Sequence, residues 1–230
     1  MRHAASRPQL EARVTRIISL EGINMAADPD HLRRVQLIRK AVLTACIIGV
    51  CAFAAITHTA SDAEGFHEGF EAFGLALILI CIVGRSWCSL YIGGRKKAEI
   101  VDRGPYSISR NPLYVFSFIG AFGMGAQTGS VLMACLFVII AFVVFYATVR
   151  REEDWLRATF GNEYEAYMVR TPRFLPNFSR WRDQDTLEIR PTLFLTTLRD
   201  GLAFLLVIPL FEALEHAQDV GWVHAMFTLP

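Results

Sequence analysis

The chain has 230 residues, of which 53% are hydrophobic, and its formal net charge is +1 at pH 7. Its mean hydropathy is +0.34, a positive value that soluble domains of this length rarely reach. The apolar residues also form blocks of roughly 17 to 25 residues, long enough for a helix to cross a bilayer. These properties exclude the ordinary soluble classes and predict an all-α, multi-span helical membrane protein without a nucleic-acid partner.

Five apolar blocks are candidate membrane spans. The third and fourth are separated only by Thr128, Gly129 and Ser130, which predicts a tight helical hairpin. The fifth is interrupted by Arg199 and Asp200, and each charge costs about 2.5–3.5 kcal/mol at the centre of a span. We therefore expect these two residues near a membrane interface or against protein. The five spans are Ile38–His58, Phe70–Tyr91, Leu113–Gln127, Val131–Val149 and Thr192–Leu214.

The basic residues predict the orientation of the spans. Eight Lys and Arg residues lie in Met1–Lys40, five in Ile92–Asn111 and eight in Arg150–Arg190. The other connections and the residues after Arg199 contain no Lys or Arg. Because cytoplasmic loops of membrane proteins carry the excess of positive charge, we expect a cytoplasmic N-terminus and an external C-terminus.

The chain is expected to divide into a basic segment at 1–37, a membrane core at 38–190 and a C-terminal span with an external tail at 191–230. In the first part, apolar residues at helical spacing among arginines predict an amphipathic helix on the inner membrane surface. A basic tail without regular structure is the alternative. No signal peptide is expected, because the first apolar block lacks a small-residue cleavage pattern. All five cysteines lie in predicted spans, so no disulfide framework is expected.

Two segments on the predicted cytoplasmic side differ from ordinary loops. The first, Ala98–Tyr114, contains two strong turn signals, Gly104-Pro105 and Asn111-Pro112. Irregular backbone near membrane depth is tolerated only where it is buried in protein or lines a cavity, so this segment is a candidate site. A simple connector between helices is the alternative.

The second segment, Arg150–Pro176, follows the fourth span directly and includes the adjacent carboxylates Glu152 and Glu153. Apolar residues at helical spacing predict a helix that ends at Gly161 and a second helix that Asn162 caps. An amphipathic surface helix is the alternative explanation of this pattern. Both segments emerge on the same side from adjacent spans, which favours one shared site.

Together the two segments resemble the isoprenylcysteine carboxyl methyltransferase family and the related membrane phospholipid methyltransferases. The resemblance rests on GPYSISRNPLY at 104–114 and on REE, FG and two tyrosines between 151 and 167, and it covers about residues 70–178. This family consists of small multi-span enzymes that bind S-adenosylmethionine at the cytoplasmic face and methylate a lipid-borne acceptor. The cofactor-binding residues that the resemblance implies are Ala98, Glu99, Ile100, Val101, Tyr106, Arg110, Asn111, Pro112, Leu113, Tyr114 and Glu152.

The chemistry of the implied cofactor, S-adenosyl-L-methionine, suits these residue types. Its amino group and its sulfonium are positively charged, and Glu152 is expected to bind the amino group through a charge-assisted hydrogen bond. Tyr106 and Tyr114 are expected to cover the adenine or to present an aromatic face to the sulfonium. Arg110 is expected to pair with the cofactor carboxylate or to reach lipid headgroups.

The acceptor side of the site departs from the family pattern. Asn111 stands where the family usually has histidine, and an amide cannot serve as a general base near neutral pH. Thr148 stands where the family has an arginine for the substrate carboxylate. Arg150 or Arg151 would have to substitute for that arginine, with Arg151 as the candidate, and Arg170 matches a second basic position. Glu153 would accept the proton of an amine acceptor, and Arg151, Arg170 and Glu153 are the candidate catalytic residues.

These features predict methyl transfer to a lipid-borne or membrane-partitioned acceptor. The lack of histidine in both segments favours an anionic acceptor, such as the carboxylate of a prenylated cysteine, because a carboxylate needs no strong base. The alternatives are N-methylation of a phospholipid amine and a non-catalytic membrane scaffold that retains the fold.

A metal or proton transporter is a further alternative. Histidines and carboxylates share the predicted outer face, and such side chains can bind transition metals. They lie in loops of different length without a tight repeat, so no metal site is predicted. The residues concerned are His58, His67, His216, His224, Glu64, Glu68 and Glu215.

Overall fold

The computed structural model describes residues 57–59, 64–95, 98–222 and 227–229. The predicted segment 1–37 lies outside the described residues. Helices dominate the described part, and two strands of three residues pair in parallel with Thr57 opposite Phe227. The elements are β1 (Thr57–Thr59), α3 (Glu64–Ile92), α4 (Pro105–Ile108), α5 (Pro112–Ala126), α6 (Val131–Phe160), α7 (Asn162–Arg170), η1 (Phe178–Arg180), α8 (Pro191–Leu202), η2 (Ala203–Leu206), α9 (Val207–Asp219) and β2 (Phe227–Leu229).

The prediction of a helical membrane protein is confirmed. Three helical stretches of the described residues are long and apolar enough to cross a membrane, and they match the second, fourth and fifth predicted spans. The third predicted span is α5, whose 15 residues reach only about 22 Å. The first predicted span lies outside the described residues except for Thr57 and His58, which belong to β1. The number of five spans therefore stays a prediction.

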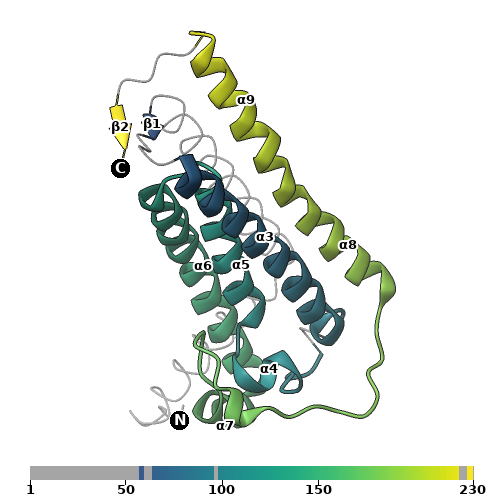
Figure 1. The fold of residues 1–230 in the computed structure, drawn as a ribbon. Helices are drawn as coiled ribbons and strands as arrows, with labels where there is room; N and C mark the ends of the chain where they lie inside the picture. The colour runs from purple at the N-terminus through teal and green to yellow at the C-terminus, as the bar shows by residue number, and fades with distance from the viewer. Residues whose placement is uncertain (1–56, 60–63, 96–97, 223–226, 230) are drawn as a thin grey trace, which may run out of the picture. The chain divides into compact units, whose positions relative to one another are not determined.

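Helices α3, α5 and α6 lie side by side, with α5 in contact with both neighbours (Figure 1). The α3–α5 contact is close because small residues face each other. A Cβ atom on Gly120 would lie 2.4 Å from the Cys81 sulfur, and one on Gly123 would lie 2.6 Å from the carbonyl oxygen of Gly74. Lipid tails are as apolar as leucine, so close backbone approach of this kind is a main source of helix association in membranes.

Helix α6 is longer than the fourth predicted span. It continues without a break from Val131 to Phe160, so Glu152 and Glu153 stand on the same helix as the span. Gly161 ends the helix with a φ of 53°, as the sequence predicted. The predicted cap is one residue off, because Gly161 also occupies the N-cap position of α7 and Asn162 is the first residue of that helix. The rigid continuation fixes the two carboxylates relative to the membrane-spanning half of the helix.

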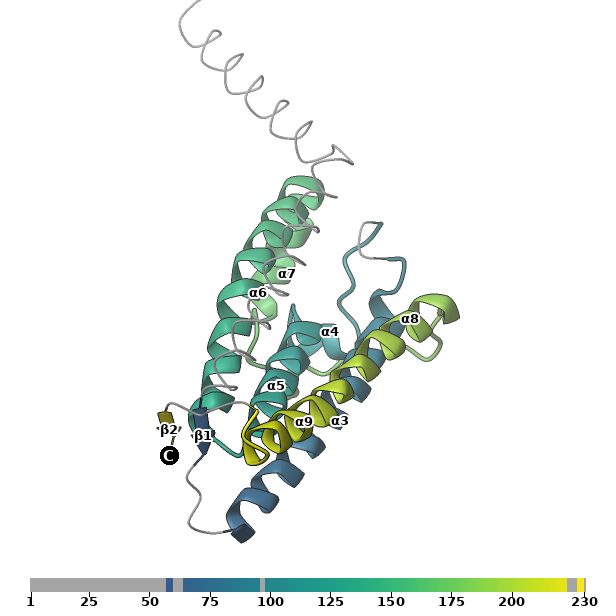
Figure 2. The same cartoon turned by 90° about the horizontal axis from the view of Figure 1, so that it is seen from above.

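The C-terminal helices α8 and α9 continue one another through the short helix η2 and cross the bundle beside α3 (Figure 2). Helix α8 packs along α3 in the opposite direction, with Gly201 close to Ile82. Arg199 and Asp200 do not interrupt this helix. Their side chains are 79% and 60% exposed and contact each other at 3.4 Å, so the described helices do not bury them.

The α3–α5 contact predicts that Gly123→Ala destabilises the fold. The added methyl group would meet the backbone of Gly74 and Ile78, which cannot move as a flexible side chain can. Overpacking of this kind costs about 1–3 kcal/mol, so the thermal unfolding midpoint in detergent should fall. Gly69→Ala is the matched control, because nothing lies within 4 Å of its Cβ position. Equal midpoints for the two variants would contradict the close contact.

Candidate functional site

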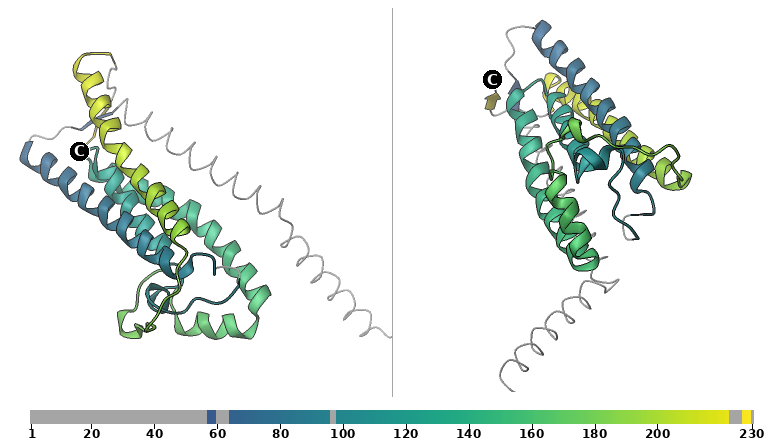
Figure 3. Two further views of the ribbon diagram at one scale, coloured as in Figure 1. Left: turned by 90° about the vertical axis from the view of Figure 1, so that its right-hand side faces the viewer. Right: turned by 90° about the horizontal axis from the view of Figure 1, so that it is seen from below.

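The polar end of the bundle is assembled from segments that are distant in sequence. Helices α4 and α7 and the return segment, defined as residues 171–190, gather at the same end of the bundle (Figure 3). Backbone hydrogen bonds join the return segment to the first predicted site segment. The amide of Arg110 donates to the carbonyl of Pro172 at 2.8 Å, and the amide of Asn177 donates to the carbonyl of Ile108 at 2.9 Å.

The Gly104-Pro105 turn is fixed between α3 and the return segment. Gly104 has a φ of 55°, and a Cβ atom there would lie 2.3 Å from the ring of Tyr91, so both conformation and space require glycine. The Tyr91 hydroxyl donates to the carboxylate of Asp183 at 3.0 Å. Trp87 of α3 stacks on Trp181 of the return segment with ring centroids 5.7 Å apart. These contacts place Tyr106, two residues after the turn, in the interior.

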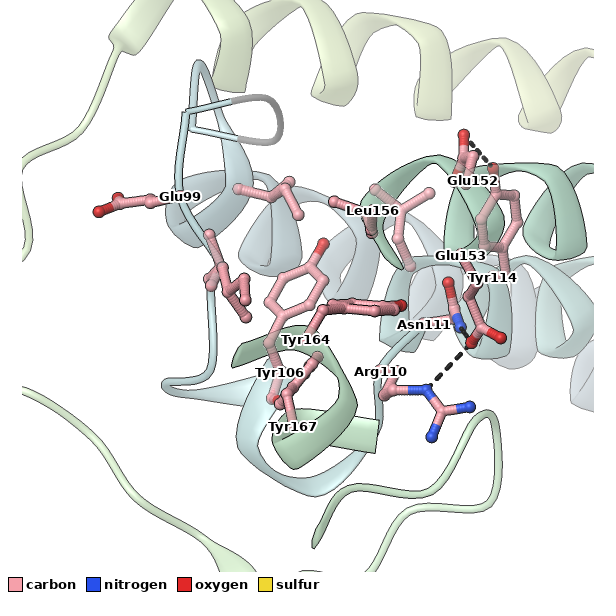
Figure 4. A pocket seen from close by; sticks show the side chains of 14 residues that line it. Glu99, Tyr106, Arg110, Asn111, Tyr114, Glu152, Glu153, Leu156, Tyr164 and Tyr167 are labelled. Carbon is pink, nitrogen blue, oxygen red and sulfur yellow. Dashed lines mark hydrogen bonds and ion pairs between the residues drawn. The ribbon is translucent and has the colours of Figure 1, made fainter. Parts of the chain in front are cut away.

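A pocket of about 170 Å³ lies between the first site segment, the end of α6 and helix α7 (Figure 4). Both segments that the sequence singled out contribute to its walls. The lining residues are Ile92, Glu99, Ile100, Val101, Tyr106, Arg110, Asn111, Leu113, Tyr114, Glu152, Glu153, Leu156, Tyr164 and Tyr167.

Glu153 is the centre of a buried ion-pair network at one side of the pocket. Its side chain is 4% exposed, and Arg110 contacts one carboxylate oxygen through Nε at 3.0 Å. Arg173 contacts the other oxygen at 2.8 Å, and Asn111 donates to the first from its side-chain amide at 3.3 Å. The hydrogen bond that Arg173 donates to Glu153 raises the pKa of Arg173 above its ordinary value. Arg110 also donates to the carbonyl of Thr171 at 2.7 Å, which binds the end of α7 to the network.

Glu152, the neighbouring carboxylate, belongs to a different part of the pocket wall. Its Oε1 atom accepts a hydrogen bond from the hydroxyl of Tyr114 at 3.3 Å. Figure 4 shows these two side chains together, on the far side of Asn111 from Tyr106. The two adjacent glutamates therefore differ in their contacts: two arginines pair with Glu153, and a tyrosine donates to Glu152.

Aromatic side chains form the opposite wall. The rings of Tyr106 and Tyr164 extend into the pocket in Figure 4, and the Tyr167 hydroxyl donates to the carbonyl of Tyr106 at 2.7 Å. Burial raises the pKa of Tyr106 well above its ordinary value and raises the pKa of Tyr164 to about 12. Both phenols therefore stay protonated near neutral pH and can donate hydrogen bonds.

The structure brings together most, though not all, of the residues predicted from sequence. Ala98 and Pro112 adjoin lining residues but do not line the pocket. Arg151 is exposed. Arg170 is 45% exposed and forms an ion pair with Asp102 at 2.8 Å. The residues that the predicted set omitted are Ile92, Leu156, Tyr164 and Tyr167 in the lining and Arg173 in the network.

Two of the omitted residues could have been predicted from the sequence. Tyr164 and Tyr167 are three residues apart on a predicted helix, a spacing that places both on one face. Arg173 could not have been predicted in this way, because it lies in an irregular segment between Pro172 and Phe174. Only the folding of the return segment brings its guanidinium to Glu153.

Known proteins resemble this chain in sequence. A model of the phospholipid methyltransferase family matches residues 72–163. The chain is 36% identical to the nickel-cobalt-cadmium resistance protein NccN of Alcaligenes xylosoxydans xylosoxydans over 185 residues, which are 80% of this chain and 86% of that protein. It is also 36% identical to the cobalt-zinc-cadmium resistance protein CzcN of Cupriavidus metallidurans over 156 residues, which are 68% of this chain and 72% of that protein.

A more distant relative is a named methyltransferase. The chain is 31% identical to the protein-S-isoprenylcysteine O-methyltransferase of Schizosaccharomyces pombe over 111 residues, which are 47% of each chain. No solved structure gives a significant match.

The network around Glu153 predicts that Arg173→Ala is more destabilising than Arg170→Ala. Loss of Arg173 leaves a buried carboxylate oxygen without its partner, which costs roughly 1–3 kcal/mol. Arg170 is 45% exposed, and Asp102 keeps Arg103 and Arg182 as partners, so the loss of Arg170 costs about 1 kcal/mol or less. Thermal unfolding midpoints of both variants in detergent measure the difference. Equal shifts would contradict a structural role for Arg173.

Proposed function

This chain belongs to the phospholipid methyltransferase family, and we propose that it transfers a methyl group from S-adenosylmethionine to a membrane-partitioned acceptor. The observation that carries the proposal is the pocket at the polar end of the bundle. The Ala98–Tyr114 segment and the Glu152–Leu156 stretch of α6 lie far apart in sequence and line this one pocket. Both are segments for which the family resemblance implies cofactor contacts.

The residue types in the pocket suit a zwitterionic sulfonium compound. The Glu152 carboxylate would hold the cofactor's amino group, and the hydroxyl of Tyr114 would fix the orientation of that carboxylate. The rings of Tyr106 and Tyr164 offer flat apolar surface for adenine or an aromatic face for the sulfonium. When bound, the cofactor supplies an activated methyl group for an in-line displacement. The chain then has to hold methyl and acceptor in line, which can contribute about 7–11 kcal/mol.

For Glu153 we propose a positioning role. Both of its oxygens are engaged by arginines, and one also accepts a hydrogen bond from Asn111. Arg110 in turn binds the carbonyl of Thr171 at the end of α7. A carboxylate occupied in this way is poorly placed to take a proton from an amine. This arrangement supports an acceptor that is already anionic over N-methylation of a phospholipid amine.

We also propose that the pocket faces the cytoplasm. Arginines gather at this end of the described bundle, among them Arg95, Arg110, Arg151, Arg170 and Arg173. Cytoplasmic ends of membrane proteins carry such an excess of positive charge. The pocket also adjoins the start of α5, so a lipid-borne acceptor would reach it from the bilayer without leaving the membrane.

The similarity to two metal-resistance proteins favours a second candidate function, a role in resistance to divalent metals. Among the described residues, no group of three or more His, Cys, Asp or Glu side chains is arranged to hold a metal ion. We therefore keep methyl transfer as the proposed activity and treat metal resistance as the physiological setting to be tested.

The methyltransferase proposal predicts that Glu152→Gln weakens S-adenosylmethionine binding. The variant loses a charge-assisted hydrogen bond worth about 1.5–3 kcal/mol, which is roughly a 10- to 100-fold rise in Kd. Calorimetry on the detergent-purified chain measures this, with Asp154→Asn as the matched control because Asp154 is 66% exposed. A well-folded wild type without affinity for the cofactor would refute the proposal and favour a non-catalytic scaffold.

The two candidate functions are separated by growth in nickel, cobalt and cadmium salts. If methylation serves metal resistance, a host strain that relies on the chain for growth should lose its tolerance with Glu152→Gln and keep it with Asp154→Asn. Comparable expression of all variants is checked by immunoblotting of membranes. Full tolerance with Glu152→Gln, despite lost cofactor binding, would separate resistance from methyl transfer.

A further inference from the structure

Arg85 is a charged residue in the apolar part of α3, remote in sequence from the two site segments. One of its terminal nitrogens donates to the hydroxyl of Ser117 on α5. Its guanidinium lies over the ring of Phe204 in η2, with 5.7 Å between the guanidinium carbon and the ring centroid. Three elements, α3, α5 and η2, thus meet at this one cation.

The position of Arg85 along α3 places it below the pocket. Ile92, which lines the pocket, is seven residues later in the same helix, or about 10 Å along its axis. On α5, Ser117 follows the lining residue Leu113 by four residues, or about 6 Å. Both spacings bring the deeper residue back to the helix face of the lining residue. The Arg85–Ser117 pair therefore lies on the pocket-lining faces of both helices, one to two turns inside the apolar bundle.

The positive charge of Arg85 lacks compensation in the described part of the chain. Its Nε atom is buried without a hydrogen-bond partner. No carboxylate among the described residues forms an ion pair with it, whereas Arg110 and Arg173 both contact Glu153. Ionisable residues inside membrane helices are costly and mark ligand or ion sites when they persist. The free Nε donor and the positive charge of Arg85, inside the apolar bundle, would be satisfied by an anionic ligand.

We propose that Arg85 and Ser117 form a binding site for the anionic group, a carboxylate or a phosphate, of a membrane-partitioned molecule. The planar guanidinium matches the paired oxygens of both groups, and Phe204 covers one of its faces. The apolar surfaces of α3 and α5 below would receive the ligand's hydrocarbon chain. The site does not depend on methyl transfer, so it can be tested apart from the proposed function.

Phosphatidylglycerol, an anionic lipid with a phosphate and two acyl chains, is a suitable probe. Native mass spectrometry of the full chain in detergent is expected to show one tightly bound lipid. Arg85→Gln should weaken this binding at least ten-fold, and Arg85→Lys should retain part of it because the charge remains. Uncharged diacylglycerol, which has the same acyl chains but no phosphate, should bind wild type and Arg85→Gln equally weakly.

Arg199→Gln is the matched control. Arg199 lies in a candidate membrane span as Arg85 does, but its side chain is 79% exposed and contacts Asp200. Its removal should change phosphatidylglycerol binding less than two-fold. Equal losses in the two glutamine variants would overturn the proposal, as would a wild type that binds both lipids equally. The thermal unfolding midpoint of each glutamine variant, measured without lipid, checks that the variant is folded before its lipid binding is compared with that of the wild type.

A second arm identifies where the anion comes from. The wild type is incubated with membrane lipid extract and S-adenosylmethionine labelled on its methyl group. If the lipid that co-purifies with the chain carries the labelled methyl group, that lipid is the acceptor. If the lipid is bound but carries no label, it is a bilayer lipid that is not methylated. Both results support the site. Cofactor binding measured by calorimetry on the same preparation reports separately on the methyltransferase proposal.

Discussion

The buried carboxylate of Glu153 is the constraint on which the polar end of the molecule depends. A carboxylate that is 4% exposed would be strongly destabilising unless its charge were compensated. Arg110 from the first site segment and Arg173 from the return segment supply that compensation. These ion pairs join helix α6, the first site segment and the return segment at one carboxylate. The ion pairs hold one side of the pocket, where Arg110, Asn111 and Glu153 line it.

The apolar half of the molecule is held by a different kind of interaction. Between α3 and α5, glycines allow backbone contact, and this contact does not depend on excluding water. Helix α6 joins the two regimes, since one end belongs to the membrane bundle and the other carries Glu152 and Glu153. Its outer face exposes large apolar side chains such as Ile139 and Val143, as expected of a surface in contact with lipid.

Local sequence features predicted the helices and much of the pocket wall. The tight turn after α5 and the change of helix at Gly161 follow from Gly129 and Gly161, which both have a positive φ, a local effect. Arg173 and Ile92 were missed because their roles depend on how the return segment and α3 meet the site. The side-by-side course of α8 and α3 likewise left no periodic signal, because it rests on contacts such as Gly201 with Ile82. The arginine at position 85 was visible in the sequence as a charge within a span, but its partners were not.

Because α6 is unbroken, insertions and deletions within it would change the position of the site residues at its end. Each residue of an α-helix advances it by about 100°, so inserting or deleting one residue between Val131 and Glu152 would turn the two carboxylates away from their partners. The turn at Thr128–Ser130 is at the opposite end of that helix from the pocket, so an extra residue there would leave their angular position unchanged. Among descendants of this sequence, gaps should therefore accumulate in the turn and be purged from the first 22 positions of α6, counted from Val131 to Glu152. We therefore expect selection to act on the number of residues in this helix as well as on their identity.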